Sequence, residues 1–174
     1  RSARGQPFFL YFAPNIPHVP LYPSAAFAGR SRRGTYGDVV EELDASVGEL
    51  LAELVTLGLD DDTLVVFTSD NGPWRAMRDW GGDAGGLREG KTTTFEGGQR
   101  VPLMARWPGH VPPRATATGM ANGMDWFPTL LELAGLPVPE RMQGRSLLPI
   151  LTGAAAPDRH RDFVRCEYYD ALDE

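Results

Sequence analysis

An amphipathic repeat between residues 36 and 54 constrains the fold of this chain more than any other feature. Apolar residues recur there at intervals of three, four and seven, on one helical face: Tyr36, Val39, Val40, Leu43, Val47, Leu50, Leu51 and Leu54. Acidic residues take the remaining positions: Asp38, Glu41, Glu42, Asp44, Glu49 and Glu53. Gly58 then supplies a helix stop, because glycine readily adopts the left-handed conformation that ends many helices. The pattern predicts one long helix with one apolar face.

Short apolar runs on both sides of this helix predict strands. They cover residues 7–13, 64–67 and 101–107, and a tail strand is expected over residues 162–169. A second helix is predicted over residues 125–134, ended by Gly135. Strands that alternate with amphipathic helices indicate an α/β fold with a mostly parallel sheet flanked by helices.

Composition limits the classes of partner. The 174 residues carry a net charge of −6, with acidic and basic side chains mixed along the chain. This balance argues against nucleic acid or an anionic membrane, since both need a basic face. No apolar run approaches the roughly 20 residues that cross a bilayer, so no transmembrane segment is expected. Cys166 is the single cysteine, which excludes an internal disulfide.

Asp70 and Asn71 directly follow the predicted strand at residues 64–67. In open α/β sheets, ligands bind outside the carboxyl ends of the strands. A carboxylate beside an amide carbonyl offers two hard oxygen ligands, which suit Ca²⁺ or Mg²⁺ rather than zinc. The same residues also make a good Asx-type turn, so both interpretations stay open. Any calcium site needs further groups, because two residues cannot supply 6–8 ligands.

His18 and Lys91 are the candidates for handling an anion. His18 lies between prolines on a rigid loop, where it either donates a proton or binds an anionic oxygen, or merely packs. Lys91 is the only lysine among 17 basic residues, which suggests a position that needs a compact ammonium rather than a planar fork. His110 and His160 are interpreted as surface residues.

The segment around Lys91 imitates a nucleotide-binding loop. Residues 85–92 read Gly-Gly-Leu-Arg-Glu-Gly-Lys-Thr, which matches the P-loop pattern as written. That loop requires a strand before it and a helix after it. No apolar strand leads into Gly85, and the glycines after Glu96 end any helix almost at once, so nucleotide binding is rejected.

Taken together, several ordered motifs resemble the formylglycine-dependent sulfatase family of the alkaline-phosphatase-like superfamily. The matching segments are Phe-Leu-Tyr-Phe-Ala-Pro with Pro-His-Val-Pro (residues 9–20), the long helix, Thr-Ser-Asp-Asn-Gly (68–72), Gly-Lys-Thr-Thr-Thr-Phe-Glu-Gly-Gly-Gln-Arg-Val-Pro (90–102), Asp-Trp-Phe-Pro-Thr-Leu-Leu-Glu-Leu-Ala-Gly (125–135) and Gly-Arg-Ser-Leu-Leu (144–148). The resemblance covers nearly the whole chain.

The resemblance implies a role for each matching residue. Asp70 and Asn71 would be calcium ligands. Lys91 would hold the sulfate oxygens and the bridging oxygen, and His18 would bind sulfate and protonate the leaving group. These roles fit the chemistry, because sulfate ester cleavage spreads negative charge that preorganised cations stabilise. The substrate would be a small sulfate ester or a sulfated glycan, and the family resemblance favours a periplasmic or secreted location.

Other residues near these motifs have two interpretations. Glu96 and Arg100 are expected to pair and brace the Gly-rich loop. Trp74, Trp80 and Arg88 lie on the long loop and either shape substrate choice or only pack.

The chain departs from the family in lacking a nucleophile. The family's C/S-x-P-S/A-x-R motif, whose first residue becomes formylglycine, is absent from the printed sequence, and residues 21–24 imitate only its centre. We therefore expect residues 1–150 to be the C-terminal portion of the catalytic domain and residues 151–174 the start of a smaller subdomain, in a fragment that is inactive alone. The alternatives are a phosphodiesterase or phosphonate ester hydrolase of the same superfamily and a non-catalytic, sulfatase-like binding domain.

Overall fold

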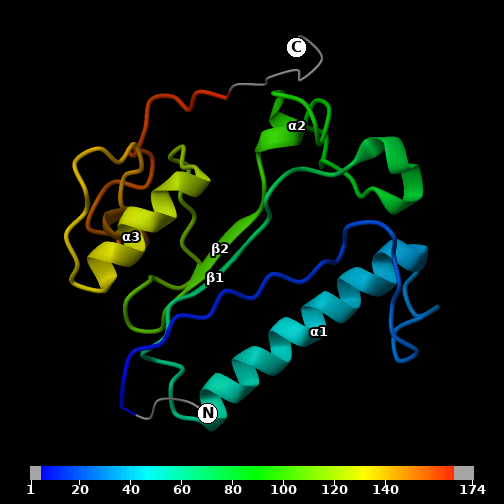
Figure 1. The fold of residues 1–174 in the computed structure, drawn as a ribbon, viewed down its shortest axis with the longest axis horizontal. Coiled ribbons are helices and arrows are strands. Elements are labelled where there is room, and N and C mark those ends of the chain that lie inside the picture. The colour runs from blue at the N-terminus through cyan, green and yellow to red at the C-terminus, as the bar shows by residue number, and fades with distance from the viewer. Residues whose placement is uncertain (1–4, 167–174) are drawn as a thin grey trace.

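The computed structural model describes residues 5–166 of the chain (Figure 1). The helices are α1 (Gly34–Thr56), α2 (Glu96–Gln99), α3 (Trp126–Leu133) and α4 (Leu148–Leu151), the 3₁₀ turns are η1 (Arg75–Trp80) and η2 (Gly123–Asp125), and the strands are β1 (Val65–Thr68) and β2 (Leu103–Arg106). In the view of Figure 1, the β1–β2 ribbon runs between α1 on one side and α3 on the other. Within the described residues, no helix is both long and apolar enough to cross a membrane.

The long helix forms where the apolar repeat predicts it. Helix α1 ends at Thr56, and Gly58 follows with a φ of +67° while its N–H bonds to the carbonyl of Val55. The acidic face is not all solvated, since Asp38 is buried rather than exposed. Its carboxylate accepts the backbone N–H groups of Gly29 and Ser31 at 2.8 and 2.7 Å, which folds the preceding loop onto the helix.

The two strands pair antiparallel, with Val65 opposite Arg106 and Thr68 opposite Leu103. The mostly parallel sheet predicted from the alternation of elements is therefore not what the described residues form. Residues 69–102 separate the two strands and carry η1 and α2. This connection leaves the end of β1 and returns to the same end as β2, which places the predicted functional loops together at one end of the ribbon (Figure 1).

The strand predicted at residues 7–13 does not form. The segment is extended, but it has no strand partner among the described residues, and its side chains are exposed, from 51% for Phe12 to 79% for Tyr11. A buried strand requires a neighbouring strand for hydrogen bonding and a layer of other elements that covers its side chains. A run of apolar residues does not by itself provide either. The tail strand is likewise absent over residues 162–166, and the rest of that prediction lies outside the described residues.

Asp125 organises the part of the chain around α3. Its side chain is completely buried and accepts backbone N–H groups from Asn122 at 2.9 Å and Arg145 at 2.8 Å. The guanidinium of Arg161 donates two further hydrogen bonds, one from each of Nε and Nη2. The imidazole of His160 also lies against Asp125, with Nε2 3.1 Å from Oδ2. One carboxylate thus joins three chain segments.

The burial of His160 corrects the prediction that it is a surface residue. Only 7% of its side chain is exposed, because the segment that carries it folds back onto Asp125. His110 does lie on the surface, where its ring stacks on Trp107 with centroids 3.9 Å apart. Local sequence could not separate the two histidines, since both are flanked by polar or turn-forming residues.

The surroundings of Asp125 also keep it ionised. Burial by itself raises the pKa of a carboxyl group, but the hydrogen bonds from Arg161, Arg145, Asn122 and His160 outweigh burial. They lower the pKa of Asp125 from 3.8 to about 2. The contacts of Asp125 with Arg161 and His160 therefore form a buried cluster in which the carboxylate is charged.

Candidate active site

Lys91 and His18 are in direct contact although 73 residues separate them in sequence. The Nζ atom of Lys91 lies 3.0 Å from Nε2 of His18, and Nδ1 of His18 lies 2.7 Å from the carbonyl oxygen of Val19. A carbonyl oxygen can only accept, so Nδ1 carries the proton and Nε2 is left with a lone pair. The Lys91 ammonium donates to that lone pair.

Backbone hydrogen bonds hold the Lys91 segment against the turn that follows β1. The N–H of Lys91 donates to the carbonyl of Pro73 at 2.9 Å, and the N–H of Gly72 donates to the carbonyl of Gly98 at 3.0 Å. A Cβ added at Gly72 would lie 1.8 Å from the carbonyl oxygen of Gly97, which no side chain tolerates. The glycines let two loops touch backbone to backbone, and this contact positions Lys91.

Asp70 and Asn71 form the turn at the start of this contact. Asp70 Oδ1 accepts the backbone N–H of Asn71 at 2.9 Å, and the side-chain amide of Asn71 donates to the carbonyl of Gly72 at 3.0 Å. Both bonds reach only the next residue, whereas an Asx turn bonds the backbone two residues on, so the Asx-type interpretation is not met. They leave Asp70 Oδ2 and Asn71 Oδ1 without a donor among the described residues, and both are oxygens of the kind that Ca²⁺ prefers.

Residues 5–166 contain no group of three or more His, Cys, Asp or Glu side chains that could hold a metal ion. The two free oxygens fit a calcium ion in their chemistry, but the remaining ligands must come from other groups.

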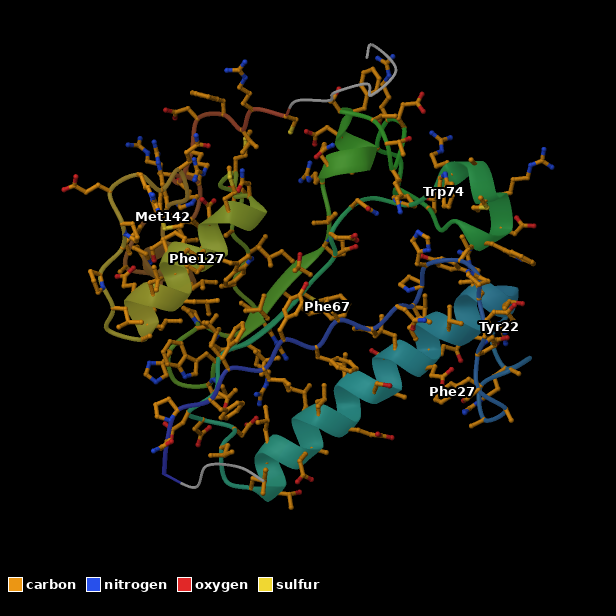
Figure 2. The ribbon with its side chains drawn as sticks, viewed as in Figure 1. Tyr22, Phe27, Phe67, Trp74, Phe127 and Met142 are labelled. Atoms are coloured by element: carbon orange, nitrogen blue, oxygen red, sulfur yellow. The ribbon has the colours of Figure 1, made fainter. Side chains whose placement is uncertain are left out.

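The aromatic ring of Trp74 lies beside both members of the cationic pair. Its centroid is 5.9 Å from that of His18, and Lys91 Nζ is 5.4 Å from its ring centroid, within cation–π range. Figure 2 labels Phe67 on the β1–β2 ribbon and Trp74 beyond this ribbon, on the loop where η1 begins. The sequence placed Trp74 on this loop, and only the fold brings it to His18.

The other loop residues stand apart from the pair. Trp80 is 55% exposed at the end of η1, and Arg88 stacks over Phe95, with its guanidinium carbon 3.8 Å from the ring centroid. Glu96 and Arg100 do pair, as predicted, at 3.5 Å. Both of these side chains are about two-thirds exposed, so the pair stabilises α2 only weakly.

The site is an open surface in these residues rather than a cavity. Two hollows of about 480 and 450 Å³ lie elsewhere, one beside Trp107 and one beside Phe12. His18 is exposed and Lys91 is partly exposed. The fold brings His18, Lys91 and Trp74 together, and the backbone bonds of Gly72 and Pro73 join the Asp70–Asn71 turn to the same loop pair.

Comparison with known proteins identifies the family. The sulfatase family model matches residues 1–136. This chain belongs to the sulfatase family. Among curated relatives, arylsulfatase A of Bos taurus is 45% identical over 170 residues, covering 97% of this chain and 33% of the relative. N-acetylgalactosamine-6-sulfatase of Homo sapiens is 46% identical over 162 residues, covering 91% of this chain and 31% of the relative. The chain thus spans about a third of the length of these sulfatases.

Solved structures agree with this assignment. A glycosaminoglycan-metabolism sulfatase of Bacteroides thetaiotaomicron, BT33336S-sulf, matches with a TM-score of 0.79 and 36% identity, over 89% of this chain and 34% of that one. The structure of BT4656 with its substrate D-glucosamine-2-N,6-O-disulfate matches with a TM-score of 0.64 and 30% identity, over 80% and 27%. The phosphonate monoester hydrolase SpPMH of Silicibacter pomeroyi matches with a TM-score of 0.59 and 31% identity, over 76% and 24%. The sulfatase neighbours have the alkaline-phosphatase-like fold, and this chain corresponds to part of that domain.

Proposed function

We propose that the protein containing this chain hydrolyses sulfate monoesters, with small sulfate esters or sulfated glycans as substrates. The observation that carries the proposal is the contact of 3.0 Å between Lys91 and His18, made by the only lysine in the sequence. Membership of the sulfatase family supports the same reaction. Overall, the ester R–O–SO₃⁻ and water give the alcohol R–OH, sulfate and a proton, with the bond between sulfur and the ester oxygen broken.

Each residue of the pair has a distinct task. The Lys91 ammonium binds the sulfuryl oxygens and the ester oxygen, where negative charge accumulates as the bond breaks. When these oxygens engage Lys91, Nε2 of His18 no longer accepts from it and can take up a proton from water. His18 then donates that proton to the departing oxygen, while the Val19 carbonyl keeps Nδ1 protonated and the ring oriented.

Calcium completes the proposed site. Asp70 and Asn71 would supply two of its ligands through the oxygens that the turn leaves without donors. When bound, the ion orients and activates the nucleophile and neutralises charge on the substrate. The chain's own contribution is to present these two oxygens next to the loop that carries Lys91.

The nucleophile in this proposal is a formylglycine that the printed sequence does not carry. Residues 1–150 are then the C-terminal portion of the catalytic domain, and residues 151–174 begin a smaller subdomain. Helix α4 runs across that boundary, and His160 and Arg161 pack on Asp125, so the two parts are in close contact. By itself the 174-residue chain is expected to be inactive.

The test is an assay of the full-length protein, matured to formylglycine, on 4-nitrophenyl sulfate. Replacing Lys91 by Ala is expected to lower kcat by at least about a hundredfold, the usual effect of removing one charge-stabilising group. Lys91→Arg tests whether a compact ammonium is required, and we expect it to recover little of the lost rate. Arg141→Ala removes an exposed cation elsewhere and should leave the rate unchanged. An unaffected rate in Lys91→Ala would remove Lys91 from the mechanism.

A phosphonate ester hydrolase is the second candidate, favoured by the match to SpPMH. The same assay with 4-nitrophenyl phenylphosphonate separates the two, because a sulfatase should have the larger kcat/KM on the sulfate ester. Binding of sulfate esters without turnover of either substrate would instead indicate a non-catalytic, sulfatase-like domain.

A further inference from the structure

Trp74 is the aromatic residue that lies against both predicted catalytic side chains. Its ring is within 5.4 Å of Lys91 Nζ and 5.9 Å of the His18 ring, tilted by 38° to the latter. A group bound between Lys91 and His18 therefore has the indole beside it.

The backbone around Trp74 is held in place by the same loops that position Lys91. The carbonyl of Pro73, the preceding residue, accepts the N–H of Lys91 at 2.9 Å, and the carbonyl of Trp74 accepts the N–H of Met77 at 2.9 Å. Gly81 packs so closely that an added Cβ would lie 2.0 Å from the Trp74 carbonyl oxygen. The indole is thus presented from a fixed position relative to the ammonium.

The exposure and partners of Trp74 differ from those of a tryptophan that only packs. Trp107 donates from Nε1 to the carbonyl of Asp61 at 3.1 Å and stacks on His110, so its ring is used by the fold. Trp74 is partly exposed, and its ring contacts in the described residues are to His18 and Lys91. A partly exposed indole at a charged site is suited to cover the apolar part of a ligand whose charged part is bound next to it.

We propose that Trp74 is the platform on which the leaving group of the substrate stacks. This inference rests on the proposed sulfatase function and specifies its substrate class. The preferred substrates are sulfate monoesters that carry a ring directly on the ester oxygen or one carbon away from it. Both an aryl ring and the C–H face of a sugar ring present a flat apolar surface to the indole, whereas a short alkyl chain does not.

The experiment compares Trp74→Ala and Trp74→Phe with the unchanged full-length protein. The esters are 4-nitrophenyl sulfate, N-acetylgalactosamine 6-sulfate and ethyl sulfate, and each ester is compared only with itself across variants. We expect Trp74→Ala to raise KM about threefold to tenfold for the ring substrate that the protein uses, and less than about twofold for ethyl sulfate. Trp74→Phe should recover most of this loss. Whether the larger effect falls on the aryl ester or on the sugar ester identifies the source of the ring.

Trp80→Ala is the matched control, because Trp80 is exposed at the end of η1 and the ring contacts of His18 and Lys91 are made by Trp74 instead. A loss of the same size for all three esters, or one confined to kcat, would show that Trp74 only steadies Lys91 and would overturn the proposal. An equal ring-selective loss in Trp80→Ala would overturn it as well.

Failure of the sulfatase function is recognised separately. If the unchanged protein hydrolyses none of the esters, the proposed function is wrong, and the platform is tested by calorimetric binding of phenyl sulfate, methyl sulfate and inorganic sulfate. Tighter binding of phenyl sulfate that is lost in Trp74→Ala supports the platform, and equal binding of phenyl and methyl sulfate rejects it.

Discussion

Asp125 and His160, 35 residues apart in sequence, meet at a distance of 3.1 Å between Oδ2 and Nε2. Asp125 lies at the start of α3, whereas His160 belongs to the segment after α4. With Arg161, which binds the same carboxylate, this contact ties the last described segment to the part of the chain that precedes it.

Replacing Asp125 by Ala should destabilise the protein by about 3 kcal/mol, because it leaves the largely buried Arg161 without its counter-charge and two backbone N–H groups without an acceptor. The measurement is the free energy of unfolding in urea. Asp158→Ala, at an exposed position nearby, is the control and should change it by less than about 0.5 kcal/mol. Equal losses in the two variants would contradict the role of the cluster.

The same carboxylate predicts how stability changes in acid. The pKa of Asp125 in the folded chain is about 2, below its ordinary 3.8, so its stabilisation is present above about pH 4. As the pH falls from about 4 to 2, this contribution of about 2 kcal/mol should be lost. The stability gap between the unchanged protein and Asp125→Asn, measured by urea unfolding, should therefore narrow over this range. A gap that stays constant down to pH 2 would refute the prediction.

Two glycine substitutions should have opposite effects. Gly72→Ala forces a Cβ to within 1.8 Å of the Gly97 carbonyl oxygen, so we expect it to separate the two loops, lower the melting temperature and reduce sulfatase activity. Gly48→Ala lies on the exposed face of α1 with open space around it, and should stabilise the protein by about 0.5–1 kcal/mol. Thermal melts and the 4-nitrophenyl sulfate assay check both. Normal activity in Gly72→Ala would argue against the loop contact as the support of Lys91.

Calcium should stabilise the full-length protein through Asp70. At a hundred times the dissociation constant, bound calcium is expected to contribute about 2.7 kcal/mol, which chelation removes. Asp70→Ala should greatly reduce this shift in melting temperature, because it deletes one carboxylate ligand. Asp79→Ala, which removes an exposed acidic residue of η1, should leave the shift intact. The same shift in Asp70→Ala would place the ion elsewhere.

Local patterns predicted individual elements well. The apolar repeat located α1, the apolar run at residues 64–67 located β1, and Gly58 and Gly135 mark the ends of α1 and α3 with left-handed φ values. These features depend on side-chain periodicity and on backbone freedom at single residues, both of which neighbouring residues determine.

Pairing between distant segments was not predictable in the same way. The apolar run at residues 7–13 has the composition of a buried strand, yet it forms no strand among the described residues. The strands β1 and β2 pair antiparallel rather than parallel. His110 and His160 looked alike in sequence, yet one is exposed and the other is buried against Asp125. Burial and strand pairing depend on which distant segment packs against a given residue, and the local sequence does not specify that segment.

By itself, then, the sequence indicated the main helix, the two segments that become β1 and β2, and the ordered motifs that mark a sulfatase, including His18, Asp70, Asn71 and Lys91 as candidates. Only the tertiary structure decided that Lys91 contacts His18, that Trp74 lies beside both, and that Asp125 is a buried, charged side chain that joins distant segments. The physical reason is range, since helices and turns arise from contacts a few residues apart, whereas a site is made by loops whose closure spans tens of residues.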